Sequence, residues 1–284
     1  MRASAFAPGH VTGFFAIAEG GQGSTGAGFC VEKGLRTIAD VRSAKANKVS
    51  LRLNGKAESL PTSQAVVKRF LELAAGKHYE ISVEHKAQLP VGYGFGMSGA
   101  GALSLSLALS KALKTRLSAL ECARIAHEAE VECGTGLGTV VAERFGGFGI
   151  RTEPADFERF EKVKFGRNLK VVLAPMKPIE TSKIIRDEGW KVRINGIGAA
   201  CVRDLLAKPD AGHFISLSRL FATESGLAHG AILEAMRASG GSMAMLGESV
   251  FVLTETPKKA AAALRKFSKN VMITKISMKG ARVS

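Results

Sequence analysis

Cysteine is scarce in this sequence, and the few cysteines follow no ligand pattern. Cys30, Cys122, Cys133 and Cys201 are scattered along the chain, and neither a C-x-x-C pair nor a cysteine–histidine ligand spacing occurs. The pattern therefore indicates neither a zinc site nor a disulfide framework. This usage is typical of a reducing compartment, so we expect a cytoplasmic protein.

Long apolar runs are also lacking. No run of 18 or more apolar residues occurs, so the sequence predicts no membrane span and no membrane partner. The first 18 residues include Arg2 and an apolar stretch, but Pro8, Gly9 and His10 interrupt it. We therefore expect no secretory signal segment there.

Acidic residues are absent from positions 257 to 284, where eight Lys or Arg contribute to a net charge of +15. A basic segment can bind nucleic acid. The pattern here instead predicts a packed helix that begins at Pro257, with Thr256 as N-cap, and then a strand over 271–276. We interpret the charge as a solvated face, which makes nucleic acid an unlikely partner and favours anionic ligands.

The chain is long enough for two domains. It has 284 residues, of which 46% are hydrophobic, and single cores tend to split near this size. No internal repeat is evident, and strands alternate with helices, which predicts the α+β class. We expect domains over 1–153 and 154–284, with the boundary near Glu153 and Pro154.

Hydrophobic periodicity and turn residues predict the elements. In the first half we expect a helix over 62–75 closed by Gly76, a strand over 79–87, a helix over 98–113, a second helix opened by the Ser118 and Glu121 capping box, and a strand over 147–151. In the second half we expect a strand over 169–174, helices over 192–207, 215–223 and 226–238, and a strand over 249–254.

A glycine-rich loop over 89–102 is the strongest chemical signal. Five glycines lie there, between a predicted strand and a predicted helix start. Glycines let a backbone approach phosphate closely, and a helix N-terminus adds unpaired N–H groups and partial positive charge. Ser98 adds a hydroxyl for phosphate or magnesium. The layout indicates a phosphate-binding loop.

Other interpretations of this loop compete. Gly94, Gly96 and Gly99 spell the dinucleotide pattern G-x-G-x-x-G, but a helix occupies the place of the second strand that pattern needs. A Walker A loop would need Gly-Lys-Ser/Thr, which is absent. Residues 96–100 nearly match a nucleophile elbow but lack its last glycine. A glycine-rich turn without any ligand remains the plain alternative.

Three motifs in order resemble those of the GHMP kinases. The loop, with Pro90, its glycines and Ser98, is similar to the second family motif, P-x-x-x-G-L-G-S-S-A. Residues 8–12, PGHVT, are similar to the first motif, and residues 239–248 occupy the place of the third. Within the family, the stretches 8–15, 126–132 and 134–138 most resemble archaeal pantoate kinases, and the likeness extends over the whole chain.

The resemblance implies a two-domain GHMP fold with a ferredoxin-like carboxy-terminal domain and ATP in a cleft between the domains. It implies ATP-dependent phosphorylation of pantoate to 4-phosphopantoate, a step toward coenzyme A, by a homodimer. The residues expected to hold ATP are Pro90, Gly94, Gly96, Met97, Ser98, Gly99, Ala100 and Gly101.

The resemblance also assigns metal and substrate residues. Glu130 and Ser98 would hold Mg²⁺, and His127, three residues before Glu130 on one helix face, would face the substrate. A carboxylate substrate needs a cation and hydroxyl donors. Arg151 is the expected cation. The hydroxyl candidates are Ser24 and either Ser182 or Thr181, which as plain structural residues would be a loop serine and a helix cap.

One position departs from the family. Family members typically read Gly-Leu-Gly-Asp after the Glu130 helix, with the aspartate as proposed catalytic base, but here Thr139 follows Gly138. Threonine cannot act as a base at neutral pH. Three explanations stay open: an inactivating change, natural or engineered; a substrate-assisted mechanism as proposed for homoserine kinases; or a replacement of the base by Glu132 or Glu143. We favour a slowed or inactive kinase.

Two other functions remain open. One is a different GHMP kinase of the homoserine or mevalonate type. The other is a non-catalytic nucleotide- or RNA-binding regulator, which the basic charge and Thr139 favour and which Ser98 and Glu130 oppose. Salt-sensitive RNA retention without pantoate-dependent ADP release would favour the regulator.

The missing-base hypothesis predicts that Thr139→Asp increases phosphoryl transfer. General-base catalysis typically contributes about 10²- to 10⁴-fold in rate, so an increase on that order is expected. Pantoate-dependent ADP release, compared between the parent and the variant, measures it. Equal rates would contradict the hypothesis.

Overall fold

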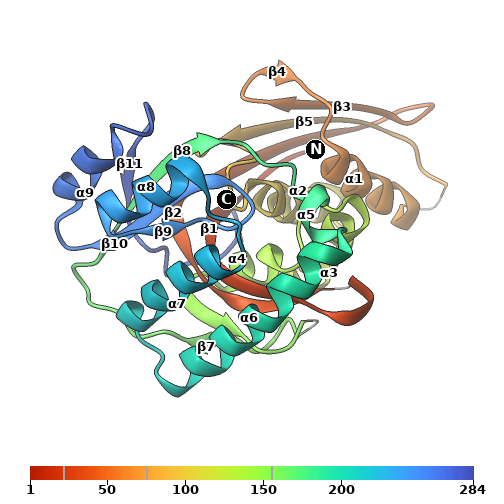
Figure 1. The fold of residues 1–284 in the computed structure, drawn as a ribbon. Coiled ribbons are helices and arrows are strands. Elements are labelled where there is room, and N and C mark those ends of the chain that lie inside the picture. Colours follow the sequence, from red (N-terminus) through yellow and green to blue (C-terminus); the bar gives the residue numbers. More distant parts are fainter. Residues whose placement is uncertain (22, 75, 155) are drawn as a thin grey trace.

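A computed structural model of the chain describes residues 1–21, 23–74, 76–154 and 156–284, and two β-sheets organise it (Figure 1). The larger sheet has the order β12-β1-β2-β5-β3-β4, with β6 paired to β2 and β7 to β6. Its strands are β1 Arg2–Ile17, β2 Ser24–Ser43, β3 Lys48–Leu53, β4 Lys56–Ala57, β5 Tyr79–Ala87, β6 Phe148–Arg151, β7 Glu161–Lys162 and β12 Arg282–Val283. The short turn η1 Glu19–Gly21 follows β1.

The β1–β2 hairpin forms the centre of this sheet. The strands run antiparallel from the Arg2 and Asp40 pair to the Ile17 and Ser24 pair, with register shifts after Pro8 and after Thr12. Of the strand pairs in the sheet, β3 and β5 run parallel and the others antiparallel. β1 is buried along most of its length, so its sequence lacks the regular alternation of polar and apolar residues of a half-exposed strand.

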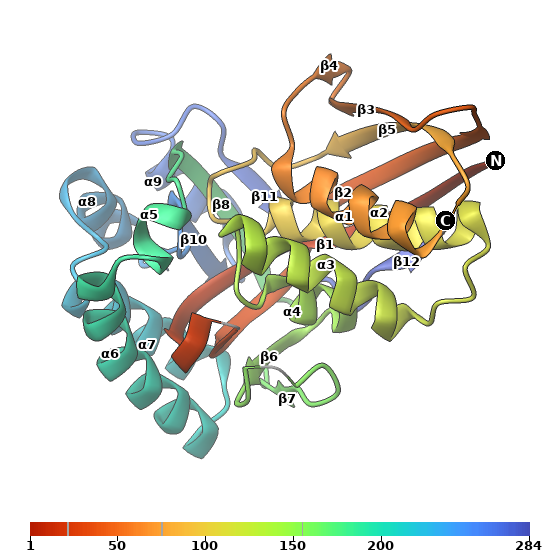
Figure 2. The same ribbon diagram turned by 90° about the vertical axis from the view of Figure 1, so that its right-hand side faces the viewer.

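Helices cover one face of the larger sheet (Figure 2). They are α1 Pro61–Leu73, α2 Met97–Leu113, α3 Ala119–Cys133 and α4 Thr139–Phe145. The central helix, α2, packs against β1 and β2 on one side and against α1, α3 and α4 on the other. Its glycine, alanine, serine and leucine side chains are almost all buried, because neighbours surround the helix.

The second sheet is antiparallel, with the order β11-β8-β10-β9. Its strands are β8 Lys170–Lys177, β9 Ser242–Met243, β10 Glu248–Thr254 and β11 Met272–Thr274. The remaining helices are α5 Ser182–Ile185, α6 Glu188–Ala207, α7 Ala211–Glu224, α8 Gly230–Ser239 and α9 Pro257–Leu264. α8 and α9 pack on this sheet, whereas α6 and α7 lie against β1 of the larger sheet.

An aromatic cluster joins the two sheets. Phe214 of α7 is fully buried, and its ring lies 4.8 Å from Phe148, 5.7 Å from Phe14 and 6.0 Å from Phe251, measured between ring centroids. Buried side chains from both sheets therefore belong to one continuous hydrophobic core. This core fixes the relative positions of the segments that build the site.

The predicted α+β class is confirmed, and several element predictions hold closely. The strand over 79–87 coincides with β5, α2 begins one residue earlier than predicted, and Ser118 and Glu121 form the expected capping box. The predicted end of the helix over 62–75 falls on Ala75, which lies outside the described residues; α1 ends at Leu73. α9 begins at Pro257 as predicted, but the Thr256 side chain does not cap it and instead bonds Thr254.

Other features of the fold were not anticipated. The first 60 residues, for which no strand is predicted from the sequence, contain β1 to β4. Ser24, considered as a loop serine, begins β2. The division at Glu153 and Pro154 and the ferredoxin-like description stay predictions. β7 and β12, both from beyond residue 153, pair within the larger sheet. Within the described residues, no helix is long and apolar enough to cross a membrane.

Phe214→Ala should lower the free energy of unfolding by about 3–5 kcal/mol, because it removes a buried ring that both sheets contact. Leu220→Ala on the same helix is the matched control, since Leu220 is 49% exposed. Urea unfolding followed by circular dichroism measures both. Equal losses of stability in the two variants would contradict a joint core.

Candidate active site

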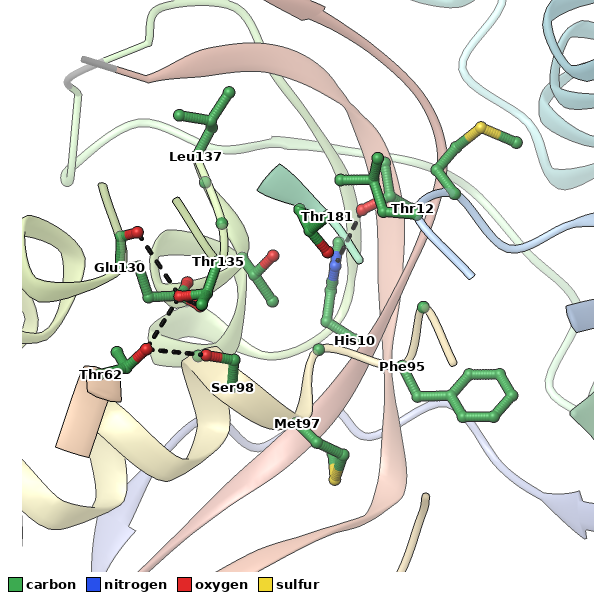
Figure 3. A pocket seen from close by; sticks show the side chains of 18 of the residues that line it. His10, Thr12, Thr62, Phe95, Met97, Ser98, Glu130, Thr135, Leu137 and Thr181 are labelled. Carbon is green, nitrogen blue, oxygen red and sulfur yellow. Dashed lines mark hydrogen bonds between the residues drawn. The ribbon is translucent and has the colours of Figure 1, made fainter. Parts of the chain in front are cut away.

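A pocket opens where segments from both halves of the chain meet (Figure 3). Its walls come from β1, the start of β2, the glycine-rich loop, the turn between α3 and α4, β6, and the residues around Thr181 and Met245. Loop and strand ends rather than helix faces therefore form most of the lining, as is usual for ligand sites on a rigid scaffold.

The glycine-rich loop has a conformation that only glycine adopts readily. Gly94 and Gly96 have φ angles of +77° and +71°, in the left-handed region. A Cβ atom at Gly94 would also lie 2.8 Å from the Met245 carbonyl oxygen. The loop thus needs these glycines for its backbone path and for close contact with the segment before β10.

The three sequence motifs contact one another through backbone atoms. The His10 N–H of the first motif donates to the Phe95 carbonyl of the loop at 3.0 Å. The Met245 N–H of the third motif donates to the Thr12 carbonyl at 3.0 Å. The three motifs, which lie far apart in the sequence, therefore meet at the pocket.

Helix α2 points its N-terminus into the pocket. It begins at Met97, and Gly96 at the N-cap has no side chain to bond the first N–H groups. The N–H groups of Met97, Ser98 and Gly99 have no intrahelical partner, because the first turn of any helix leaves such groups unpaired. These N–H groups and the helix dipole suit an anion such as phosphate.

Ser98 and Glu130 belong to one polar network. Thr62 Oγ1 lies 3.4 Å from Ser98 Oγ and 3.0 Å from Thr135 Oγ1, which in turn donates to Glu130 Oε1 at 3.4 Å (Figure 3). Glu130 is 1% exposed, and its Oε2 has no hydrogen-bond partner in the part of the chain that the structure describes. Burial raises the pKa of this carboxyl to about 7, opposed by hydrogen bonds from Ser98 and Thr135.

A second buried carboxyl, Glu143 of α4, lies beside the loop. A Cβ atom at Gly96 would lie 2.6 Å from Glu143 Oε1 and 2.8 Å from Thr139 Cγ2. Neither Glu143 oxygen has a hydrogen-bond partner among the residues that the structure describes. Burial together with the Glu130 charge raises the pKa of Glu143 well above its usual value. Glu132, the other replacement considered for the missing base, is 58% exposed in its side chain and pairs with Arg69.

Arg151 is a buried cation at the other end of the pocket. Its Nη1 donates to the Gly138 carbonyl at 2.9 Å and its Nη2 donates to Ser24 Oγ at 2.6 Å, while Nε has no partner. No carboxylate in the described part of the chain forms an ion pair with it. Burial lowers the pKa of Arg151 to about 10, so the guanidinium stays charged at neutral pH.

Most of the predicted site residues line this pocket. They are Ser24, Gly94, Gly96, Met97, Ser98, Gly99, Gly101, Glu130, Thr139, Arg151, Thr181 and Ser182. Pro90, Ala100 and His127 are not among the lining residues. His127 is 5% exposed and packs edge-on against Phe157 with ring centroids 5.2 Å apart. Ser182 Oγ donates to Glu180 Oε1 at 3.2 Å.

Several polar residues that line the pocket are not among the predicted site residues. They are His10, Thr12, Thr62, Ser63, His85 and Thr135. For His10 a signal existed, because it lies within the first motif. Thr62 and Thr135 had none, because their place beside Ser98 and Glu130 depends on how α1 packs against α3.

The donor set fits a magnesium ion. Glu130 Oε2 is buried without a partner, and Ser98 belongs to the same network. Gly136 leaves the space free, since a Cβ atom there would lie 2.5 Å from Glu130 Oε2. No group of three or more His, Cys, Asp or Glu that could hold a metal occurs among the described residues. Magnesium needs few protein ligands when phosphates and water complete its shell.

Known proteins resemble this chain in sequence. The family model of the GHMP kinase N-terminal domain matches residues 62–147. A pantoate kinase of Methanocaldococcus jannaschii is 33% identical over 271 residues, which cover 92% of this chain and 96% of that protein. The match thus extends well beyond the glycine-rich loop.

Solved structures show the same fold. A phosphotransferase related to the coenzyme A biosynthesis pathway superposes with a TM-score of 0.86 at 27% identity, over 100% of this chain and 99% of that one. A homoserine kinase of Cytophaga hutchinsonii superposes with a TM-score of 0.71 at 17% identity, over 100% and 97% of the two chains. The latter likeness concerns the fold alone.

The buried Glu143 carboxyl should make stability depend on pH. A carboxyl group whose pKa is raised in the folded state contributes stability at low pH. This contribution is lost as the pH rises above the ordinary pKa of the group, here 4.5. Relative to Glu143→Gln, the parent should therefore lose stability between pH 5 and 8, by at most about 1.4 kcal/mol per pH unit. Urea unfolding without divalent metal measures this difference.

The exposed Glu224→Gln is the matched control for removal of a carboxyl charge. Curves for the parent and Glu143→Gln that stay parallel across this pH range would contradict the prediction.

Proposed function

We propose, since this chain belongs to the pantoate kinase family of the GHMP kinases, that it transfers the γ-phosphoryl group of ATP to the hydroxymethyl group of pantoate. The product is 4-phosphopantoate. The reaction needs a site for phosphates, a site for the substrate carboxylate, and a hydroxyl held in line with the γ-phosphorus. The pocket supplies candidates for each.

The observation that carries the proposal is the buried Arg151 guanidinium without a carboxylate partner. A buried charge is costly unless it is paired, so this site favours an anionic ligand. The guanidinium lies directly over Gly138, where a Cβ atom would fall 1.6 Å from Nη2. A planar guanidinium suits a carboxylate, and Ser24 beside it supplies a hydroxyl.

The glycine-rich loop suits the phosphates of ATP. The first N–H groups of α2 and the backbone at Gly94 and Gly96 approach the pocket without intervening side chains. Gly138, under Arg151, directly precedes Thr139, whose side chain adjoins Gly96. A substrate carboxylate on Arg151 would therefore lie close to the phosphate end of the pocket.

Glu130 and Ser98 are the residues that would hold Mg²⁺. When bound, this ion neutralises charge on the phosphates and favours transfer. The Glu130 carboxyl, with its unpartnered Oε2, is suited to accept a cation. Thr135 orients it by donating a hydrogen bond to Oε1, and the Thr62 hydroxyl in turn contacts the Thr135 hydroxyl.

Arg151→Ala should raise the KM for pantoate about 10- to 150-fold, because hydrogen bonds to charged groups contribute about 1.5–3 kcal/mol. The KM for ATP should change much less. Steady-state ADP release with varied pantoate measures both values. Arg203→Ala, which removes an exposed arginine from α6, is the control. An unchanged KM for pantoate in Arg151→Ala would refute the assignment of this guanidinium.

A further inference from the structure

His10 lies at the centre of the pocket but has no role so far. It lines the pocket from β1 and is 7% exposed. Its backbone N–H donates to the Phe95 carbonyl, so its position is fixed relative to the glycine-rich loop. A Cβ atom at Gly96 would lie 3.0 Å from His10 N and 2.8 Å from Thr139 Cγ2. The backbone of His10 therefore lies close to the glycine that Thr139, at the place of the expected aspartate, also adjoins.

The imidazole ring is held at its Nδ1 side. Nδ1 lies 3.3 Å from Thr12 Oγ1, as the dashed line in Figure 3 shows. The opposite edge of the ring lies over Gly28, where a Cβ atom would fall 2.7 Å from both Cε1 and Nε2. No side chain at position 28 therefore covers this edge, and among the described residues the ring's hydrogen bond is the one at Nδ1.

The ring lies near the carboxylate end of the pocket as well. Gly28 pairs with Gly149 of β6, and Gly26 pairs with Arg151 two residues further along that strand. Burial, and in second place the Arg151 charge, lower the pKa of His10 to about 3, so the imidazole is neutral at neutral pH. His10 thus lies between the phosphate loop and the guanidinium expected to bind the substrate.

Pantoate offers a carboxylate for the guanidinium and a hydroxyl group for transfer at the phosphate loop. Its acceptor hydroxymethyl group is separated from its carboxylate by two carbon atoms. A carboxylate on Arg151 consequently directs the hydroxymethyl group toward the loop, past the His10 ring. A neutral imidazole with one nitrogen fixed by a hydroxyl can offer the other as a hydrogen-bond acceptor.

We infer that His10 Nε2 accepts the hydrogen bond of the pantoate hydroxymethyl group and orients its oxygen toward the γ-phosphorus of ATP. Nδ1–H then donates to Thr12 Oγ1, which fixes the tautomer. This inference rests on the proposed function and makes His10 a catalytic residue that touches the reacting hydroxyl. A residue of β1 then contacts the acceptor hydroxyl in place of the aspartate that family members have at the position of Thr139.

The chemical step balances without another reactant. The hydroxyl oxygen forms a bond to the γ-phosphorus, and the bond from that phosphorus to the bridging oxygen breaks, which leaves ADP. The hydroxyl proton passes to Nε2 and then to solvent. In a loose phosphoryl-transfer transition state the attacking oxygen needs orientation more than early deprotonation, so a weakly basic imidazole suffices.

Substrate binding should also favour this role. A carboxylate on Arg151 cancels the positive charge that lowers the basicity of His10. The imidazole consequently becomes a better acceptor once pantoate is bound. Carboxylate recognition and activation of the hydroxyl are thus linked through adjacent side chains.

The test compares His10→Asn with His10→Gln. The asparagine amide reaches the place of Nδ1 only, whereas the longer glutamine amide reaches toward Nε2. We expect kcat to fall about 10²- to 10⁴-fold in His10→Asn, with the KM for ATP within about threefold of the parent. His10→Gln should recover at least about tenfold of the lost kcat. His78→Asn, at an exposed histidine, is the control.

The outcomes separate this inference from the proposed function. A kcat of His10→Asn within about threefold of the parent, or His10→Gln no better than His10→Asn, overturns the role of Nε2. Equal losses in kcat and in ATP binding, with a lowered melting temperature, overturn it in favour of a structural role. A parent that releases no ADP with pantoate instead overturns the proposed function itself.

Discussion

The site depends on close backbone contact among three chain segments that have no room for side chains. Gly94 and Gly96 of the loop, Gly247 before β10, and the backbone of His10 approach one another so closely that added Cβ atoms would overlap their neighbours. The approach brings the helix N-terminus of α2 to the pocket with its N–H groups exposed. It also fixes β1, from the first residues of the chain, against a loop that lies about 90 residues later.

Around this contact the pocket separates charges that would otherwise neutralise each other. Among the described residues, buried Arg151 forms no ion pair with a carboxylate, and the buried carboxyls of Glu130 and Glu143 each have at least one oxygen atom without a hydrogen-bond partner. An Arg151 pair with either carboxylate would stabilise the empty protein but would block anion binding. The arrangement instead suits a ligand that brings both an anion for Arg151 and a cation for Glu130, as a hydroxy acid and magnesium-bound ATP would.

The threonine at position 139 is less disabling in this setting than in the sequence alone. Its side chain adjoins Gly96, where the expected aspartate would face the loop, and other polar groups lie close to the same glycine. The Glu143 carboxyl lies beside the same glycine from the next turn of α4, and the backbone N–H of His10 approaches it from β1. The pocket therefore retains polar groups near the position expected for the acceptor hydroxyl of the substrate.

The sequence by itself determined the local devices and the chemistry they permit. Some features depend on interactions between residues close in the chain, so they can be predicted without a structure. They are the loop glycines, the Ser118 capping box, the extent of β5 and α2, and the order of the three motifs. Ser98 lies in one of these motifs, Glu130 and Arg151 were assigned from the family resemblance, and all three line the pocket. Local pattern could not show that His127 packs against Phe157 or that β1 and β2 form a long hairpin.

The tertiary structure alone decided which polar groups face each other: His10 beside Thr12 and Arg151, Arg151 over Gly138, and Glu143 beneath the loop. The physical reason is that each of these contacts joins segments whose approach is set by the packing of the whole core, which no short window of sequence encodes.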